Sequence, residues 1–412
     1  MRILLINQFY RPDVAATGQL LSDLAQGLAA DGHEVHVLCS QRGYGGGQIK
    51  EEQIRDKPQV TSPERSSVHV HRVRALGFGR QHVLGRLADY LSFFVLAVWK
   101  AVFLPGMDVC VGLTTPPFVG LVGLFLKVLK GTRLVLWTMD LYPEVAVAYG
   151  AIKKNGLACR SLSCISRTLY RNASAIISLG EVMTQRLIEA GANPDKITTV
   201  HNWVPGESVR PIAADGDSRL QEEWDIDGRI VLMYSGNLGL GHDLDTIVKA
   251  VHLLGNTVNL RVLFIGDGKG KERLLQMAKE LRLGCVDFYL PVPLERLSDS
   301  LAVGDIHIVS QKPGTQGLIV PSKLYGIMAA ARPAIFIGPE DCEVAQVIND
   351  SGAGIVVPPG DQTALAKAIG DLANSPEKRL EMGQRGRNYY EQHFGQDKSV
   401  SRIIAAIKRI QR

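Results

Sequence analysis

The segment SGNLGLG, residues 235–241, is the clearest candidate anion site in the sequence. It follows an apolar run that predicts a strand, and it precedes a helical pattern. Glycines let the backbone approach a ligand closely, and the first amides of a helix are unpaired donors that attract a diphosphate. We therefore predict that Gly236, Asn237 and Gly239 bind an anion. The alternative is a tight turn in which Asp243 caps the helix.

Lys323 is a second candidate for anion binding. It follows Pro321 and Ser322, where an extended segment turns into a helix rich in small residues. A positive charge at the start of a helix opposes the helix dipole unless an anion lies between the two. We predict that Ser322 and Lys323 bind a phosphate group, and the alternative is a solvated lysine. Near the N-terminus, Thr17-Gly18 also precedes a helix, where an anion-binding amide at Gly18 and simple helix initiation are equally supported.

Two carboxylates lie four residues apart in the segment WTMDLYPE, residues 137–144. This segment follows a predicted strand, which places Asp140 and Glu144 near the strand's carboxyl end. Paired acids can divide general-base and positioning work between them. We predict catalytic roles for Asp140 and Glu144. The alternative is a turn aspartate followed by a glutamate at the start of a helix.

The sequence predicts neither a metal ion nor an organic cofactor. Its six cysteines form no CxxC pair, and none of its three DxD triplets follows a strand as a metal-binding triplet does. His69 and His71 share one face of a predicted strand, which we interpret as an edge-strand surface rather than a metal pair. The segment 266–271 misses the dinucleotide fingerprint GxGxxG because Lys271 replaces its third glycine.

Strands and helices must bring these candidates together. Short apolar runs alternate with helical patterns along the chain, which predicts an α/β protein with parallel, doubly wound sheets. Such sheets bind ligands at the carboxyl ends of their strands. The predicted strands are 3–7, 34–39, 68–73, 109–113, 133–137, 175–178, 197–200, 230–235, 261–265, 286–289, 306–309, 334–337 and 354–357, and helices at about 362–374, 376–394 and 397–411 end the chain.

A polar segment separates two such domains. The chain has 412 residues, enough for two to three domains of roughly 150 residues. Residues 206–228 are predicted as a linker between domains at 1–205 and 229–394, and a last helix at 395–412 is predicted to return to the first domain. The formal charge of +5 is too small for a dedicated nucleic-acid binder.

Residues 84–104 form an apolar stretch that allows three interpretations. Arg86, Asp89 and Lys100 interrupt it, which counts against a membrane span of about 20 apolar residues. A helix buried in an α/β domain is favoured. The third interpretation is an interfacial helix beside arginine and lysine side chains, with these aromatic residues in the lipid headgroup layer: Tyr90, Phe93, Phe94, Trp99 and Phe103. Because no signal-peptide pattern is present, we expect a cytoplasmic protein that could lie on the inner face of the membrane.

Several segments, in their order along the chain, resemble the retaining nucleotide-sugar glycosyltransferases of family 4, group 1, which have the glycosyltransferase-B fold of two Rossmann-like domains. The likeness covers nearly the whole chain. It rests on NQFYRPDVAATGQLLSDLAQGLAADGHEVHVLC, HNWV, SGNLGLGHDLDTIVKA, FIGDGKGKERL, VPSKLYGIMAAARPAIFIGP and GAGIVVPPGD. The Leu-Tyr-Pro and SGNLG forms are similar to the WbuB-like branch of lipopolysaccharide and capsule enzymes, whose acceptors are often polyprenyl-diphosphate sugars.

The resemblance implies an acceptor-binding first domain and a second domain that binds a nucleotide sugar, most often a UDP-sugar. Loop amides and Lys323 would stabilise the leaving diphosphate without metal. Asp140 or Glu144 would orient or deprotonate the acceptor hydroxyl, and the sugar would be transferred with retention. The implied donor-binding residues are Gly18, Gly236, Asn237, Gly239, Gly266, Ser322 and Lys323.

The sequence also departs from the family pattern. The family's two glutamates, seven residues apart, would fall at Leu318 and Gly326, so the carboxylate that contacts the donor ribose is missing. The usual arginine and lysine around the diphosphate would fall near Asn237 and Leu240, and Met139 stands where many relatives carry a histidine. Two alternatives therefore remain: a nucleotide-sugar 2-epimerase on the same fold, and an inactive subunit that only binds the donor.

Overall fold

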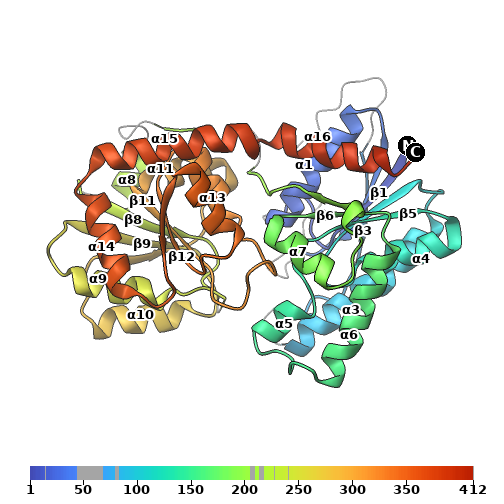
Figure 1. The fold of residues 1–412 in the computed structure, drawn as a ribbon, viewed down its shortest axis with the longest axis horizontal. Helices are drawn as coiled ribbons and strands as arrows, with labels where there is room; N and C mark the ends of the chain where they lie inside the picture. Colours follow the sequence, from blue (N-terminus) through green and yellow to red (C-terminus); the bar gives the residue numbers. More distant parts are fainter. Residues whose placement is uncertain are drawn as a thin grey trace. The chain divides into compact units, whose positions relative to one another are not determined.

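A computed structural model of the chain describes residues 1–13, 15–43, 68–78, 83–204, 209–212, 218–226, 228–239 and 241–411. The chain forms two compact units, each built around its own parallel sheet (Figure 1). The first unit consists of Met1–His201 and Gln396–Arg412, and the second of Asn202–Gly395. The predicted fold class, two doubly wound α/β domains, is confirmed.

The first unit has a seven-stranded parallel sheet in the order β3-β2-β1-β4-β5-β6-β7. Its strands are β1 (Arg2–Ile6), β2 (Glu34–Ser40), β3 (Val68–Val73), β4 (Val109–Leu113), β5 (Arg133–Trp137), β6 (Ala175–Ser178) and β7 (Ile197–Thr199). Its helices are α1 (Ala16–Ala30), α3 (Val83–Phe103), α4 (Gly120–Lys130), α5 (Glu144–Ala148), α6 (Leu157–Asn172), α7 (Glu181–Glu189), η1 (Pro194–Lys196) and α16 (Gln396–Arg409). The strand order reverses between β1 and β4, the place where such sheets leave a crevice for a ligand.

The second unit has a six-stranded parallel sheet in the order β10-β9-β8-β11-β12-β13. Its strands are β8 (Ile230–Ser235), β9 (Leu260–Ile265), β10 (Val286–Tyr289), β11 (Ile306–Ser310), β12 (Ala334–Ile337) and β13 (Gly354–Val357). Its helices are α8 (Ser218–Glu223), α9 (Asp245–Leu254), α10 (Lys271–Glu280), η3 (Leu294–Arg296), α11 (Leu297–Val303), α12 (Lys323–Ala329), α13 (Glu343–Ser351), α14 (Gln362–Ala373) and α15 (Pro376–His393). Here the reversal lies between β8 and β11.

Central strands of both sheets are apolar at nearly every position because helices cover both faces of a parallel sheet. Ile3, Leu4, Leu5 and Ile6 of β1 are fully buried. In β4, a Cβ on Gly112 would lie only 3.3 Å from the Cα of Gly120 in α4. This pair of glycines lets α4 pack closely on the sheet.

The last helix, α16, packs on α1 within the first unit (Figure 1). Gly27 of α1 leaves the space that the side chain of Val400 fills. The Nζ atom of Lys408 lies 2.7 Å from a carboxylate oxygen of Asp31, at the end of α1, and this contact lowers the pKa of Asp31. Residues distant in sequence thus complete one core.

The segment predicted as a linker contributes to the core of the second unit. Of residues 206–228, the structure describes 209–212, 218–226 and 228, and the rest lie outside the described residues. Helix α8 lies within this segment, and its Leu220 and the following Trp224 are buried in a cluster with residues of β8 and β9. The linker prediction missed this packing because two apolar residues in a polar segment barely change its composition.

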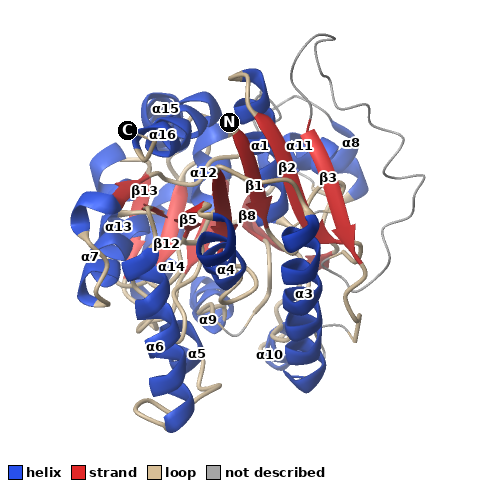
Figure 2. Ribbon diagram, turned by 90° about the vertical axis from the view of Figure 1, so that its right-hand side faces the viewer, coloured by secondary structure: helices blue, strands red, loops and turns tan. Residues whose placement is uncertain are grey.

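Helix α3 is apolar on two opposite sides, but only one of them is buried. Phe93, Ala97 and Ala101 pack against α4 and the sheet, and Figure 2 shows α3 and α4 on one face of the strands. The opposite side carries residues that are 57–69% exposed: Leu87, Leu91, Val95, Trp99 and Phe103. The favoured prediction of a fully buried helix is therefore wrong. Of the five aromatic residues predicted for the headgroup layer, Phe93 is buried and Tyr90 and Phe94 are half-buried. Among the described residues, no helix is long and apolar enough to cross a membrane.

Candidate active-site residues of the two units

Two glycine-rich loops pack against each other at the carboxyl ends of β8 and β9. Gly236 has φ 137° and Gly266 has φ 147°, and a Cβ on Gly266 would collide with the carbonyl group of Gly236. Only glycine fits this close approach. The Gly236 amide donates to the carbonyl oxygen of Ile265 at 2.7 Å, and the Gly266 amide donates to that of Tyr289 at 2.9 Å. Both predicted anion donors are thus engaged within the fold, and these glycines serve the packing of the loops.

Asn237 and Gly239 lie in the same loop but differ in their hydrogen bonding. Among the described residues, neither of their amides donates a hydrogen bond. Asn237 is exposed and Gly239 is half-buried. The backbone amides of Asn237 and Gly239 are therefore available as donors to an anion. Leu240, where the resemblance places a family lysine, lies outside the described residues.

Lys323, the first residue of α12, reaches the glycine-rich loop after β8. Its Nζ donates to the hydroxyl oxygen of Tyr234 at 2.5 Å and lies 4.1 Å from the centroid of the Tyr234 ring. A Cβ on Gly236 would collide with the Lys323 side chain. Within the part of the chain that is described, no carboxylate pairs with this lysine, and burial lowers its pKa to about 7. An anionic ligand would restore the stability of the charged form.

His242 lies near Lys323, directly after the glycine-rich segment, and had no role predicted from the sequence. Its Nδ1 donates to the Ser310 carbonyl oxygen at 2.7 Å, which leaves Nε2 as an acceptor. Burial, and next the charge of Lys323, lower the pKa of His242 to about 4. The ring is therefore neutral at pH 7. The position of His242 directly after the glycine-rich segment was the sequence signal that could have marked it as a site residue.

Asp243 holds the loop in place but does not cap α9. Its Oδ2 accepts hydrogen bonds from the Thr246 hydroxyl and from the Gly360 amide, both at 2.8 Å. Its own amide donates to the Ser310 hydroxyl at 2.7 Å. The two bonds to Ser310, from the Asp243 amide and from His242, tie the loop after β8 to the end of β11, where the strand order reverses.

The loop that leads to Lys323 is fixed by Gln311 at the end of β11. The Gln311 side-chain amide donates to the carbonyl oxygen of Thr315 at 3.0 Å and to its hydroxyl at 3.2 Å. Ser322 is half-buried and makes no capping hydrogen bond to α12. The predicted pair Ser322 and Lys323 is thus brought to the same strand ends as Asn237 and Gly239.

In the first unit, Asn7 and Gln8 lie directly after β1. Both side chains are buried, and the Asn7 side-chain amide donates to the carbonyl oxygen of Phe9 at 2.7 Å. Within the described residues, Asn7 Oδ1 and Gln8 Oε1 accept no hydrogen bond. Buried acceptors without a partner are costly, which makes these two candidates for binding hydroxyl groups of a ligand. These two residues were not predicted as site residues, although two polar residues that end an apolar strand are a signal in the sequence.

Gly18 lies inside α1, and its amide is not free to bind an anion. Its N–H donates to the carbonyl oxygen of Ala15 at 2.9 Å. A Cβ at this position would lie 3.1 Å from the backbone of Phe9 and of Tyr10. The structure therefore favours helix initiation and close packing over the predicted anion-binding amide.

Asp140 and Glu144 lie in different surroundings. The Asp140 amide donates to the Thr114 hydroxyl at 3.0 Å, which links the end of β5 to the end of β4. Burial raises the pKa of Asp140 to about 6. Its charge also contributes to the raised pKa of Tyr149, after burial. Glu144 is exposed at the start of α5. Of the two predicted catalytic carboxylates, Asp140 has the environment of a group adapted to chemistry.

Two family models match this chain. The Glycosyl transferase 4-like domain matches residues 16–203, and the Glycosyl transferases group 1 model matches residues 217–389. The chain belongs to the group 1 glycosyltransferases. Each model falls largely within one of the two structural units of the enzyme.

Two relatives are similar to this glycosyltransferase over most of its length. It is 26% identical to the probable glycosyltransferase WbjE of Pseudomonas aeruginosa, over 86% of this chain and 87% of WbjE. It is 25% identical to the putative colanic acid biosynthesis glycosyl transferase WcaI of Escherichia coli (strain K12), over 99% of this chain and 100% of WcaI. Similarity along the full length includes both units.

Solved structures share the fold of the enzyme. The Anabaena protein Alr3699/HepE in complex with UDP-glucose aligns with a TM-score of 0.74 at 15% identity, over 99% of this chain and 100% of that chain. At this identity, the similarity establishes the fold. The predicted glycosyltransferase-B fold is confirmed.

Proposed function

We propose that the enzyme transfers a sugar from a nucleoside-diphosphate sugar to a hydroxyl of a lipid-linked glycan, with retention of the anomeric configuration. The observation that carries this proposal is Lys323, which is half-buried beside the loop after β8 and is unpaired with any described carboxylate. The complex of Alr3699/HepE with UDP-glucose supports a UDP-sugar as the donor. The function named for WcaI supports a surface polysaccharide as the product.

The donor diphosphate would lie against Lys323 and the amides of Asn237 and Gly239. Negative charge develops on the leaving phosphate as the bond to the sugar breaks, and fixed donors stabilise it most where water is excluded. The hydrogen bond to Tyr234 holds the Lys323 ammonium group in position. No divalent ion is needed in this arrangement, because the lysine supplies the positive charge.

The acceptor hydroxyl would lie near Asp140. A carboxylate with a pKa of about 6 is ionised at pH 7, and it is a stronger hydrogen-bond acceptor than an ordinary aspartate. Asn7 Oδ1 and Gln8 Oε1 would accept hydrogen bonds from sugar hydroxyls. With retention and without an enzyme nucleophile, the leaving phosphate oxygen takes the acceptor proton while the acceptor oxygen bonds to the sugar.

A membrane-bound acceptor would explain the exposed side of α3, which we call the α3 stripe: Leu87, Leu91, Val95, Trp99 and Phe103. Arg86 and Lys100 are exposed beside its two ends and suit anionic headgroups. Lys130 is engaged elsewhere, since its Nζ donates to the carbonyl oxygens of Val102 and Leu104 at 2.6 and 2.7 Å. We propose that the α3 stripe rests on the surface of an anionic bilayer.

A donor panel tests the reaction. Radiolabelled UDP-, GDP- and dTDP-sugars are incubated with the enzyme and bacterial membranes, and label is measured in extracted lipid. Transfer from one donor to lipid supports the proposal, and the anomeric configuration of the product decides retention. Formation of an epimer without acceptor would instead identify a nucleotide-sugar 2-epimerase. Donor binding without turnover would identify an inactive subunit.

A vesicle experiment tests the α3 stripe. The double variant Trp99→Ser, Phe103→Ser should lose about tenfold or more in binding to vesicles that contain phosphatidylglycerol, because each buried aromatic contributes about 1.5–3 kcal/mol. Leu380→Ser is the matched control, since Leu380 is 74% exposed in the second unit. Equal binding of both variants in a sedimentation assay would reject this surface.

A further inference from the structure

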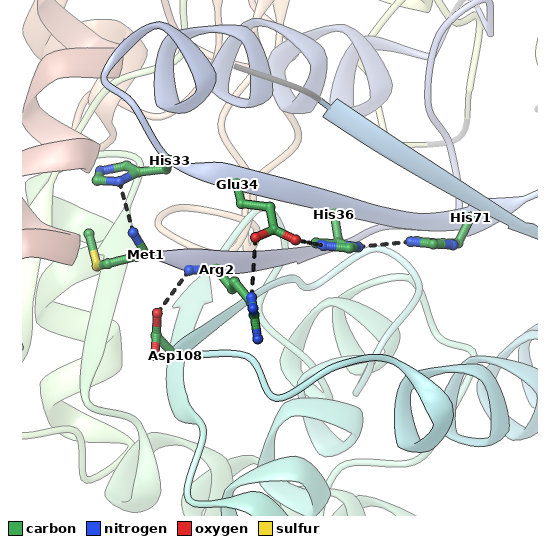
Figure 3. Close-up of polar contacts among 7 residues, drawn as sticks. All are labelled: Met1, Arg2, His33, Glu34, His36, His71 and Asp108. Atoms are coloured by element: carbon green, nitrogen blue, oxygen red, sulfur yellow. Dashed lines mark hydrogen bonds and ion pairs between the residues drawn. The ribbon is translucent and has the colours of Figure 1, made fainter. Parts of the chain in front are cut away.

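A cluster of histidine and glutamate side chains lies on one face of β2 and β3. Glu34 and His36 are two residues apart in β2, and His69 and His71 are two residues apart in β3. The members of each pair therefore share a face of the sheet, and the register of the two strands puts all four on the same face. The two strands are parallel, and His36 pairs directly with His69. Figure 3 shows Glu34, His36 and His71 in a row.

The cluster has the spacing of a metal site. One ligand atom from each of Glu34, His36 and His69 lies within 4.8 Å of the others. His36 Nε2 is 3.0 Å from Glu34 Oε1, and the His36 and His69 rings stack with their centroids 4.9 Å apart. His36 is buried and His69 is exposed, so the cluster is open to solvent on one side.

Two further side chains hold the ligand atoms in orientation (Figure 3). Arg2 Nε donates to Glu34 Oε2 at 3.1 Å, which leaves Oε1 directed at His36. His36 Nδ1 lies 2.9 Å from His71 Nε2. If His36 Nε2 bound a metal, Nδ1 of His36 would carry the proton and donate a hydrogen bond to His71 Nε2. Metal-binding histidines typically have such an outer partner.

We propose that Glu34, His36 and His69 bind a divalent transition metal, with Zn²⁺ as the best match and water in the fourth position. Two imidazoles and one carboxylate are a common ligand set for Zn²⁺. The cluster begins at the amino end of β2, whereas the candidate active-site residues follow the carboxyl ends of strands. The metal therefore acts as a structural tie between β2 and the edge strand β3. Arg2, and Lys100 near His71, oppose the metal's charge and limit its affinity.

Calorimetric titration of Zn²⁺ into the tag-free full chain, first stripped with EDTA, tests this proposal. We expect one site whose affinity falls about tenfold or more in His69→Ala and in Glu34→Gln. Both replace side chains that are not fully buried, so these variants should fold. The matched control is His252→Ala, an exposed histidine of α9, which should bind Zn²⁺ as the unmodified chain does. Absence of a site in the unmodified chain would overturn the proposal.

Two further measurements separate this site from other histidines. Zn²⁺ should raise the unfolding temperature of the unmodified chain and of His252→Ala, but not that of His69→Ala, because a ligand stabilises only the form that binds it. Met1 and His33 offer a competing pair, since the terminal amine lies 3.5 Å from His33 Nδ1. Loss of binding in His33→Ala with full binding in His69→Ala would assign the metal to that pair and reject the proposal.

Discussion

The two units reverse their strand order in the same way, yet they place opposite chemistry at the reversal. In the second unit, β8 lies between β9 and β11, and the cation Lys323 reaches the loop after β8. In the first unit, β1 lies between β2 and β4, and the buried acceptors Asn7 and Gln8 follow β1, with Asp140 tied to the end of β4. The fold fixes where a ligand can bind, and the side chains decide which one.

Burial favours the neutral form of both Lys323 and Asp140. It lowers the pKa of Lys323 to about 7 and raises the pKa of Asp140 to about 6. In both cases, burial is the cause and no described residue of opposite charge compensates it. A shift of this kind is typical of groups adapted to a ligand or a reaction. The comparison predicts a donor-binding defect from Lys323 and a chemical defect from Asp140.

The largest expected effect on kcat follows Asp140→Asn. We expect kcat to fall about 10²-fold, because the acceptor hydroxyl loses the carboxylate that orients it, with donor affinity unchanged. Glu144→Gln, an exposed group at the start of α5, should change kcat by less than about threefold. Steady-state kinetics and calorimetry with the donor measure both quantities. Equal losses from the two variants would remove the distinction between these carboxylates.

The stability of Asp140→Asn separates chemistry from folding. The folded-state pKa of Asp140 is raised from 3.8 to about 6, so the stability that this group contributes falls as pH rises through that range. At pH 8, the asparagine variant should therefore be at least as stable as the unmodified enzyme. A lower unfolding temperature at that pH would show that its loss of activity is structural.

Lys323→Ala should reduce kcat/KM about 10²–10³-fold, as the loss of one donor to a developing anion does. In contrast to Asp140→Asn, it should also weaken donor binding. Lys279→Ala, an exposed lysine of α10, is the matched control. Unchanged donor affinity in Lys323→Ala would break the comparison between the two units.

The pH dependence of donor binding gives a smaller effect with a definite sign. Lys323 is protonated below a pKa of about 7, so the affinity for UDP-glucose should fall as pH rises above 7. Between pH 7 and 9 the protonated fraction falls about 50-fold, which sets the upper limit of the loss. In Lys323→Arg the guanidinium stays charged, and the affinity should be flat over this range. Calorimetry at each pH measures it, and a flat profile for the unmodified enzyme contradicts the assignment.

Gly266→Ala should have the smallest effect on activity, acting through loop packing. The φ of 147° and the collision with Gly236 predict a loss of about 1–3 kcal/mol in the free energy of unfolding. Gly284→Ala is the control, because a Cβ there meets no atom within 4 Å. Urea unfolding compares the two. A Gly266→Ala variant as stable as Gly284→Ala would show that the two loops do not need their close contact.

Much of the fold was predictable, because buried parallel strands are short apolar runs that can be recognised without knowing which strands they pair with. Lys323 and the glycine-rich segment could also be predicted as site candidates, since each has a local signal at a helix start. The contact between Lys323 and Tyr234 was not, because it joins segments distant in sequence. The assumption that glycine amides bind an anion failed at Gly236, whose N–H is used by the neighbouring strand.

Other features depend on which face of an element meets its neighbours. Hydrophobic periodicity cannot distinguish the buried side of α3 from the exposed one, since both sides are apolar. His69 and His71 were predicted to share a strand face, but the pairing of β3 with β2 adds Glu34 and His36. The first fact depends on how α3 packs on its neighbours, and the second depends on the strand register.

The position of α16 determines how this enzyme can be dissected. A fragment that stops at residue 201 would leave α1 without Val400 in the space at Gly27 and without Lys408 beside Asp31. An isolated first unit therefore has to be assembled from two separate stretches of the gene, for example by splicing 396–412 onto 1–201 through a short designed connection. The second unit, by contrast, is one continuous stretch and can be expressed with a single pair of boundaries.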